Sequence, residues 1–304
     1  QPRANPHVTV LQHDMRVGST MLPWTRQMGG RRAICVCHDE TRRIVEPALR
    51  AAGLVVEHLL VVPPSANGAA LVVVDRAARQ AAGDALTTVG APVVVVGDDL
   101  DDDGLITMML EAPVSHLVGD PRDKDFGITS AKLASGDVFG LEKYVTGPVS
   151  ERLVQDDLGK HRALDEVAAW AESIGARLPT MHRLHTVLDE LLMNALREGG
   201  PAALRWAADD QTIAVSVEDG RGSLRQRDII DHVRRARRDS GRPEPASTEG
   251  GAGLGLYLVL ANVASLVINI APGRRTEIVC MFDLARRARP SVARVRSLHV
   301  FGAA

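Results

Sequence analysis

Aromatic residues are scarce in this chain, at 3% of 304 residues. A protein that binds single-stranded nucleic acid stacks exposed aromatic rings on the bases, so the composition argues against that class. The formal net charge of −2 provides no overall field that would attract nucleic acid or an anionic membrane. We therefore expect neither as a partner. A hydrophobic content of 45% is instead typical of globular domains, with cores built here mainly from Val, Leu, Ile and Ala.

Cysteines and long apolar runs are also lacking. Cys35, Cys37 and Cys280 are too few for a disulfide framework, and they indicate free thiols in a reducing compartment. No stretch approaches the roughly 18 uninterrupted apolar residues of a membrane span. Residues 1–30 lack a charged start followed by an apolar region, so they do not resemble a signal peptide. A cytoplasmic location is the expectation.

The first half of the chain predicts a doubly wound α/β domain. Residues 1–30 mix Pro, Gly and polar residues and are expected to form an N-terminal extension. From 31 to about 135, continuous apolar runs alternate with helical patterns, which is typical of a parallel sheet covered on both faces. The predicted strands are 33–37, 54–60, 70–74, 92–96 and 114–118, and the predicted helices are 41–52, 76–88 and 104–111.

The second half predicts a two-layer α+β sandwich. Residues 136–160 are interpreted as a linker, and a domain at 161–286 contains runs of helices and antiparallel strands. Its predicted helices are 161–174, 180–197 and 253–264, and its predicted strands are 203–207, 212–217, 266–270 and 277–283. Residues 287–304 are expected to be a basic C-terminal tail.

Three features of this domain depart from its apolar pattern: two are polar residues and the third is a glycine-rich run. Glu190 and Asn194 are four apart on one helix, so their side chains share a face and could hold a hydrated Mg²⁺ through oxygen atoms. Asp219 ends a strand before Gly220 and Gly222, where a carboxylate could accept the exocyclic amine of adenine. A glycine-rich run then opens a helix, whose backbone N–H groups and positive end suit phosphates. Its members are Gly250, Gly251, Gly253, Leu254 and Gly255.

Each motif is common alone, but their order is specific. Glu-x-x-x-Asn, Asp-Gly-x-Gly, Gly-x-Gly-x-Gly and Gly273-x-x-Thr276 follow one another, and together they resemble the Bergerat-type superfamily of gyrase, heat-shock chaperone, histidine-kinase and mismatch-repair ATPases. The resemblance covers residues 150–286 and is closest to anti-sigma-factor kinases. It implies that ATP is the ligand, with the glycine-rich backbone on its phosphates and residues 221–249 as a lid. Lid arginines that could stabilise the transferring phosphate are Arg234, Arg235, Arg237 and Arg238.

The resemblance also implies individual roles. Asn194 would bind Mg²⁺, Glu190 would act as the general base, and Asp219 would bind the adenine amine, supported through a water by Thr276. Gly222 would let the base approach the backbone. Counting back from the glycines leaves Glu218 as an alternative to Asp219, and we prefer Asp219 because its shorter carboxylate suits a strand end.

The first domain resembles a two-component receiver, because Asp75 ends its third predicted strand and Asp39-Glu40 follow the first. Asp75 is therefore a candidate phosphoacceptor. Two parts of that pattern differ, since Gly97 replaces a Ser or Thr and Asp120-Pro121 replaces Lys-Pro. Without the lysine, no cation answers the charge of a phosphorylated aspartate. We interpret the domain as a pseudo-receiver, with a working receiver as the alternative.

These features predict a signalling kinase that phosphorylates a partner protein and is gated by the receiver-like domain. His161, His182 and His185 lack the neighbours of a phosphoacceptor histidine, so the acceptor is expected in another protein. The alternative is an ATP-gated protein-binding module without phosphotransfer. A topoisomerase- or chaperone-like ATPase is a weaker third hypothesis. A homodimer is a further possibility that the sequence leaves open.

Overall fold

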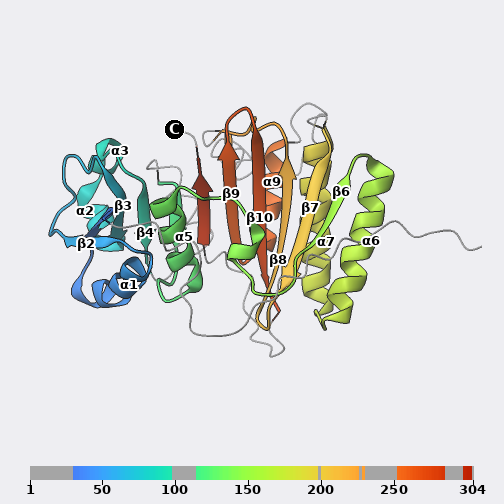
Figure 1. Cartoon of the computed structure of the whole chain (residues 1–304), viewed down its shortest axis with the longest axis horizontal. Helices are drawn as coiled ribbons and strands as arrows, with labels where there is room; N and C mark the ends of the chain where they lie inside the picture. Colours follow the sequence, from blue (N-terminus) through green and yellow to red (C-terminus); the bar gives the residue numbers. More distant parts are fainter. Residues whose placement is uncertain are drawn as a thin grey trace, which may run out of the picture.

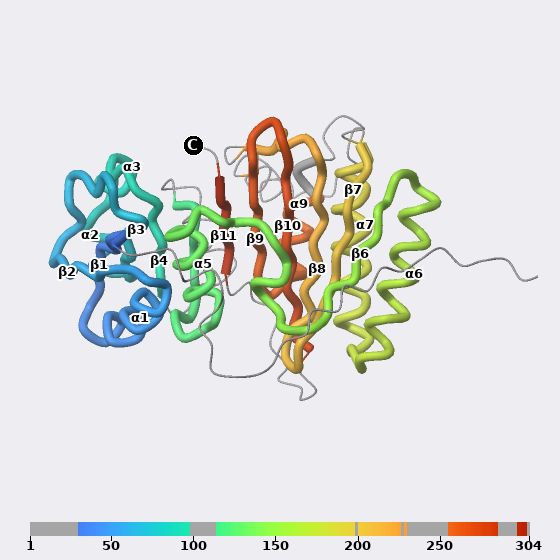
Figure 2. Tube along the Cα trace, viewed as in Figure 1, coloured from blue at the N-terminus to red at the C-terminus, as the bar shows by residue number. Residues whose placement is uncertain are grey.

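The computed structural model describes residues 30–97, 114–197, 200–225, 228–229, 252–284 and 297–302. Within these residues, all strands belong to one eleven-stranded sheet in the order β2-β1-β3-β4-β5-β11-β9-β10-β8-β7-β6 (Figures 1 and 2). The sheet therefore runs without a break from the first half of the chain to the second. None of the helices in the described ranges is long and apolar enough to cross a membrane.

Five parallel strands form the first half of the sheet. They are β1 (Arg32–Val36), β2 (Val55–His58), β3 (Ala69–Asp75), β4 (Val93–Val96) and β5 (His116–Val118). Their spatial order β2-β1-β3-β4-β5 reverses at β1, as in a doubly wound sheet. β4 is buried along its whole length, because helices cover both faces of the sheet.

The helices of this half divide between the two faces. Cys35 and Val73 pack with α1 (Asp39–Ala51) and α5 (Lys124–Ser135), whereas Ile34 and Val72 pack with α2 (Arg76–Ala82) and α3 (Ala85–Thr88). The sequence predicted α1, and it predicted α2 and α3 as one helix, which Gly83 divides at a φ of 49°. The predicted helix 104–111 lies outside the described residues. α5 was not predicted, because its inward side carries polar residues that break the apolar period.

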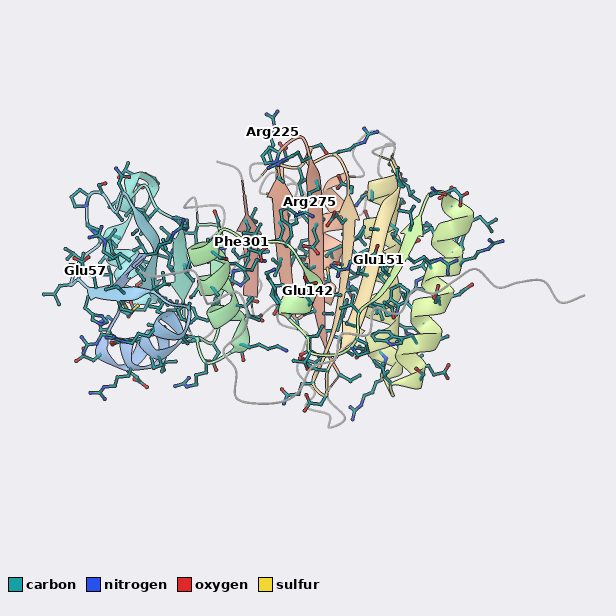
Figure 3. The ribbon with its side chains drawn as sticks, viewed as in Figure 1. Glu57, Glu142, Glu151, Arg225, Arg275 and Phe301 are labelled. Carbon is teal, nitrogen blue, oxygen red and sulfur yellow. The ribbon has the colours of Figure 1, made fainter. Side chains whose placement is uncertain are left out.

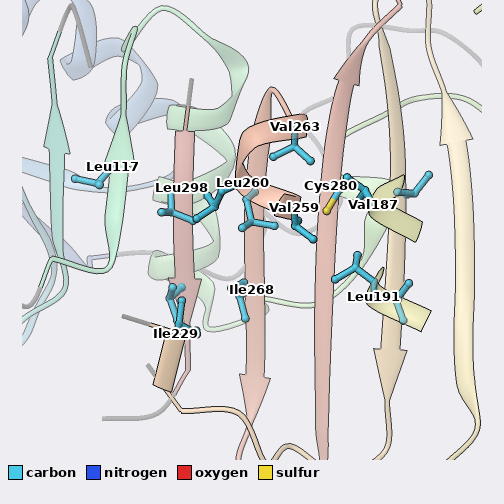
Figure 4. Close-up of a cluster of buried hydrophobic side chains, with 14 of the residues drawn as sticks. Leu117, Val187, Leu191, Ile229, Val259, Leu260, Val263, Ile268, Cys280 and Leu298 are labelled. Atoms are coloured by element: carbon cyan, nitrogen blue, oxygen red, sulfur yellow. The ribbon is translucent and has the colours of Figure 1, made fainter. Parts of the chain in front are cut away.

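The second half of the sheet is antiparallel, and its own three α-helices cover one face. Its strands are β6 (Ser150–Val154), β7 (Ala202–Ala208), β8 (Thr212–Asp219), β9 (Ser265–Ala271) and β10 (Arg275–Asp283). The helices are α6 (Asp157–Ser173), α7 (Leu178–Arg197) and α9 (Ala252–Asn262). Figure 4 shows Val187 and Leu191 of α7 beside Val259 of α9 and Cys280 of β10. This arrangement is the two-layer sandwich that the sequence predicted.

The segment predicted as a linker, 136–160, is part of the fold. It contains the short 3-10 helix η2 (Leu141–Lys143), strand β6 and the first residues of α6. Leu141, Tyr144 and Val145 cover the second face of the sheet, where they pack on Val279 and Met281. The glycines at 140, 147 and 159 suggested a linker, but they lie between apolar residues that the sheet buries.

Residues 297–301, expected within a basic tail, form strand β11 (Ser297–Phe301). β11 pairs in parallel with β9 over five residues and antiparallel with β5 over three, so it joins the two halves of the sheet. Phe301, labelled in Figure 3, lies at this junction. The strand was missed because Ser297 and His299 alternate with its apolar residues, as in an exposed segment. Both are nevertheless buried.

The polar side of α5 explains that burial. Asp125 accepts hydrogen bonds from Ser265 Oγ of β9 at 2.8 Å and from Ser297 Oγ of β11 at 2.6 Å. Thr129 Oγ1 lies 3.3 Å from the Nε2 atom of His299. Asp125 and Thr129 of α5 thus each meet a polar partner on β9 or β11 across the junction.

Candidate functional site

Two of the predicted site residues lie on α7, beside its buried apolar stripe. Glu190 and Asn194 are half-buried, and Asn194 Nδ2 donates a 2.9 Å hydrogen bond to Glu190 Oε1. Because the amide nitrogen makes this bond, the amide oxygen Oδ1 of Asn194 is directed away from Glu190. An amide oxygen is a ligand that Mg²⁺ accepts, together with waters and phosphate oxygens. The residues present therefore fit a Mg²⁺ ion that arrives with a nucleotide.

Gly255 brings the glycine-rich run against this pair. A Cβ atom built on Gly255 would lie 1.8 Å from Glu190 Oε1 and 2.5 Å from Glu190 Cδ, so only glycine fits without moving the carboxylate. Gly253 and Leu254 belong to the first turn of α9, where backbone N–H groups have no partner within the helix. Gly250 and Gly251 lie outside the described residues, as do the four predicted lid arginines at 234, 235, 237 and 238.

Strand alternation separates Asp219 from Glu218. Val215 and Val217 of β8 point into the cluster under α7 and α9, so Asp219, two residues further on, lies on that same face. Glu218 lies on the opposite face, where its Oε1 is 3.7 Å from Arg275 Nη1. Burial raises the pKa of Glu218. Of the two acids that the sequence left open, only Asp219 shares a face with Asn194 and the start of α9.

The turn after Asp219 is fixed by close backbone packing. Asp219 Oδ1 accepts hydrogen bonds from the backbone N–H of Arg221 at 2.9 Å and of Gly222 at 3.3 Å. Gly222 has a φ of +60°, and a Cβ atom there would lie 2.2 Å from the carbonyl oxygen of Ala271. Gly273 N–H donates to the Gly222 carbonyl at 3.1 Å. The Asp-Gly-x-Gly motif is therefore packed against the turn between β9 and β10.

Thr276 lies directly opposite Asp219 in the sheet. The two residues are register partners on β10 and β8, and both lie on the face covered by α7 and α9. Thr276 is 2% exposed, yet its Oγ1 has no hydrogen-bond partner within the described part of the chain. A buried hydroxyl without a partner costs free energy, so its presence beside a carboxylate indicates a place where a ligand or water completes the bonding.

The predicted site residues therefore form two groups on one face of the sheet. Glu190, Asn194 and Gly255 form the first, and Asp219 and Thr276, with the turn at Gly222, form the second. α7 contacts both β8 and β10, which carry the second group. This arrangement offers an oxygen ligand and helix N–H groups on one side and an acceptor for an amine on the other.

One residue of this region was missed by the sequence interpretation. Lys160 of α6 is 8% exposed, and its Nζ lies 2.7 Å from Asp189 Oδ1 on α7. Asp189 directly precedes Glu190, so the ion pair fixes the rotation of α7 relative to α6. The signal in the sequence was the acidic pair Asp189-Glu190, of which only the second residue had been given a role.

The candidate phosphoacceptor Asp75 lies at the carboxyl edge of the parallel strands, in a cavity of about 340 Å³ that also contains His38, Gly97 and Arg122. Its Oδ1 accepts from Ala78 N–H at 2.8 Å, and its Oδ2 accepts from His38 N–H at 2.7 Å and lies 2.8 Å from His38 Nδ1. Burial alone would raise the pKa of Asp75, but these hydrogen bonds hold it below its usual value. Asp75 serves here as the N-cap of α2.

Of the acidic pair predicted beside Asp75, Glu40 lines the same cavity as Asp75, whereas Asp39 bonds to a neighbouring arginine. Asp39 forms an ion pair with Arg42 at 2.9 Å, and within the described ranges there is no cluster of three acidic, His or Cys residues able to hold a metal ion. The strand order of the first domain is the one expected for a receiver, and Asp75 and Glu40 share a cavity there.

Comparison with protein families matches the second half of the chain. Residues 181–286 match the family described as "Histidine kinase-, DNA gyrase B-, and HSP90-like ATPase". No curated protein matches the chain. The matched segment begins in α7 and ends after β10, so it contains both groups of site residues. The second half of the chain thus contains an ATPase domain of this type, which implies ATP binding, usually with Mg²⁺.

Proposed function

We propose that this protein is an ATP-dependent signalling kinase that transfers the γ-phosphoryl group to a partner protein. The matched domain supports ATP binding. The first domain has the sheet order of a receiver, but the Asp75 carboxylate is engaged as the N-cap of α2, which supports a gating or docking role rather than phosphate acceptance. We expect a protein partner and a cytoplasmic location, and a homodimer is the oligomeric state to test.

The roles follow from the two groups of residues. Asp219 accepts the adenine amine, and Thr276 Oγ1 completes its bonding through a water molecule. Asn194 Oδ1 supplies one oxygen ligand to Mg²⁺, while the backbone of Gly253–Gly255 donates to the phosphates. Glu190 accepts the proton of the attacking hydroxyl or water. Bound Mg²⁺-ATP supplies the phosphoryl group, and catalysis consists mainly of positioning and charge stabilisation.

The single observation that supports this proposal most strongly is the buried Thr276 hydroxyl. It has no partner in the described residues, and it lies in register with Asp219 on the side of the sheet that α7 and α9 cover. Valine has the same shape as threonine and would avoid the cost of an unpaired hydroxyl. Binding of a ligand explains why a hydroxyl is placed there.

Nucleotide titration of Thr276→Val tests this directly. We expect the free energy of unfolding to stay the same or rise, because an unsatisfied hydroxyl is removed, while ATP affinity falls about tenfold. Asn194→Ala should bind ATP more weakly only in the presence of Mg²⁺. A Thr276→Val protein that loses stability and keeps full ATP affinity would show that the hydroxyl has a structural role.

Phosphotransfer requires a separate experiment. The purified chain is incubated with γ-labelled ATP and candidate partner proteins, and transfer to a partner is measured for wild type and Glu190→Gln. We expect transfer with the wild type and a loss of at least a hundredfold with Glu190→Gln, the usual size of general-base effects. If label never reaches any partner while ATP still binds, the kinase assignment fails.

A second function, an ATP-gated binding module, is favoured by one observation. Glu190 Oε1 accepts the hydrogen bond of Asn194 and touches Gly255, so in this arrangement it connects α7 to α9 rather than facing a substrate. In that case nucleotide would order the surroundings of α9 and a partner would recognise the ordered state. Glu190→Gln would then leave partner binding intact, whereas Asn194→Ala would abolish its ATP dependence.

A further inference from the structure

Lys132 of the first domain reaches deep into the second. It lies on α5, it is 1% exposed, and its Nζ donates to Tyr144 Oη at 2.7 Å and to Asn269 Oδ1 at 2.9 Å. Its Nζ also lies 3.9 Å from the ring centroid of Phe301 on β11, at a distance typical of a cation–π contact. A buried ammonium group needs such partners, because burial without them is costly.

Asn269 connects this ammonium group to a buried acid. Its Nδ2 donates at 2.9 Å to Glu277 Oε2, which also accepts from the Gly140 N–H at 2.9 Å. Glu277 is 0% exposed. The amide of Asn269 thus presents its oxygen to the cation and its nitrogen to the carboxylate, and it bridges two buried charges of opposite sign. Burial lowers the pKa of Lys132 to about 7. The negative charge of Glu277 acts in the other direction and is the largest influence that raises this pKa.

Glu277 is the residue next to Thr276 on β10. The strand alternation directs Thr276 toward the nucleotide face and Glu277 toward the opposite face, which η2 and α5 cover. Their register partners on β8 are Asp219 and Glu218. A hydrogen bond that fixes Glu277 from behind the sheet therefore also fixes the backbone on which Thr276 faces Asp219.

We propose that Lys132 is a positioning residue of the nucleotide site, which holds Thr276 opposite Asp219 through Asn269 and Glu277. This inference rests on the proposed binding of ATP at Asp219. It assigns to the first domain a direct contribution to purine recognition, because the position of β10 depends on a side chain from α5. Nucleotide binding and docking of the first domain are then coupled, and each strengthens the other.

The two charges are expected to act as a unit. Removal of Lys132 alone leaves Glu277 as a buried charge without a counterion, and removal of the Glu277 charge alone does the same to Lys132. Removal of both charges leaves no unpaired buried charge, and the amide oxygen of a glutamine at 277 can still accept from Asn269 Nδ2 and from the Gly140 N–H, although Asn269 Oδ1 loses its donor. The single variants should therefore displace β10, and the double variant should not.

The experiment uses the full chain and measures binding of ATP and of GTP to Lys132→Met, to Glu277→Gln and to the double variant. Each single variant should lose about tenfold in ATP affinity and little in GTP affinity, so that preference for ATP over GTP falls. The double variant should bind ATP within about threefold of wild type. Circular dichroism at the titration temperature establishes that each protein is folded.

Lys124→Met is the matched control. Lys124 begins the same helix, and its Nζ also reaches the second half of the chain, 3.0 Å from Asp209 Oδ2, but its side chain is 46% exposed. Because Lys124 is exposed and its partner Asp209 lies near Asp283, at the end of β10 opposite to Thr276, the variant should change ATP affinity by less than about twofold.

The outcomes separate this inference from the proposed function. Wild-type protein that binds no ATP refutes the proposed function itself. Wild type that binds ATP, with single variants that lose stability but keep their preference for ATP over GTP, gives Lys132 a merely structural role and overturns the inference. Additive losses in the double variant also overturn it. If Lys132→Met does not fold, Glu277→Gln and the double variant still test the prediction of recovery.

Discussion

Replacing Gly222 by alanine should damage both the fold and the nucleotide site. The residue has a φ of +60°, which costs an alanine about 1 kcal/mol. The added Cβ atom would also lie 2.2 Å from the carbonyl oxygen of Ala271 and 2.9 Å from the backbone nitrogens of Arg274 and Arg275. These are backbone atoms, so relief requires the whole β9–β10 turn to shift. Together the two effects should lower the free energy of unfolding by about 3 kcal/mol.

The same shift should weaken ATP binding. The Gly222 N–H donates to Asp219 Oδ1, and Thr276 follows the β9–β10 turn, so movement of that turn separates the two residues proposed to bind adenine. We expect a loss of at least tenfold in ATP affinity, equal to about 1.4 kcal/mol. Chemical denaturation gives the stability, and nucleotide titration well below the unfolding transition gives the affinity.

Gly220→Ala provides the control in the same loop. A Cβ atom on Gly220 would meet nothing within 4 Å, and its φ does not lie in the left-handed region. The substitution should therefore change stability by no more than about 0.5 kcal/mol and leave ATP affinity unchanged. Equal behaviour of the two variants would refute the argument that backbone packing at Gly222 holds the residues proposed to bind adenine.

Two further predictions concern the first half of the chain and the junction. Burial lowers the pKa of His299 to about 3, so the native state stays neutral while the unfolded state binds a proton below about pH 6.5. Stability should therefore fall as the pH decreases from 7 to 5.5, by about 1.3 kcal/mol for this histidine, and His299→Gln should remove that part of the slope in denaturation experiments. Asp75→Asn should lower stability by about 1–2 kcal/mol, because its amide group cannot accept all the hydrogen bonds from His38 and Ala78. Stable, Mg²⁺-dependent acyl-phosphate labelling that is lost in Asp75→Asn would instead indicate a working receiver.

Local patterns predicted the parts of the fold whose residues follow a simple period. Continuous valine runs predicted the parallel strands, and the spacing of Leu184 to Ala195 predicted α7. α5 and β11 were missed for the opposite reason. Thr129 and His299 are polar residues that are buried only because they face each other across 170 residues of chain. No local window contains both members of such a pair.

In the candidate site, too, local sequence patterns predicted some features, and others depend on packing between distant segments. The sequence placed Glu190 and Asn194 on one helix face, and the structure adds the hydrogen bond between them. The sequence interpretation preferred Asp219 to Glu218 on side-chain length alone, and the structure adds the face of the sheet that each acid occupies. The missing bond of Thr276 is likewise a property of the packed sheet, since only burial makes an unpaired hydroxyl costly.

The position of β11 has a consequence for how the two halves of this protein cooperate. β5 is three residues long and pairs with β11 on one side, while β9 pairs with β11 on the other. Without β11, both strands would present unpaired backbone groups, and Asp125 would lose its hydrogen bond from Ser297. The last strand of the chain thus completes the environment of α5, the helix that carries Lys132. A change in the first domain that moves α5 must therefore disturb β11, β9 and, through Asn269, β10. Because the sheet is continuous, a signal received by the first domain needs no hinge to reach the residues proposed to bind the nucleotide.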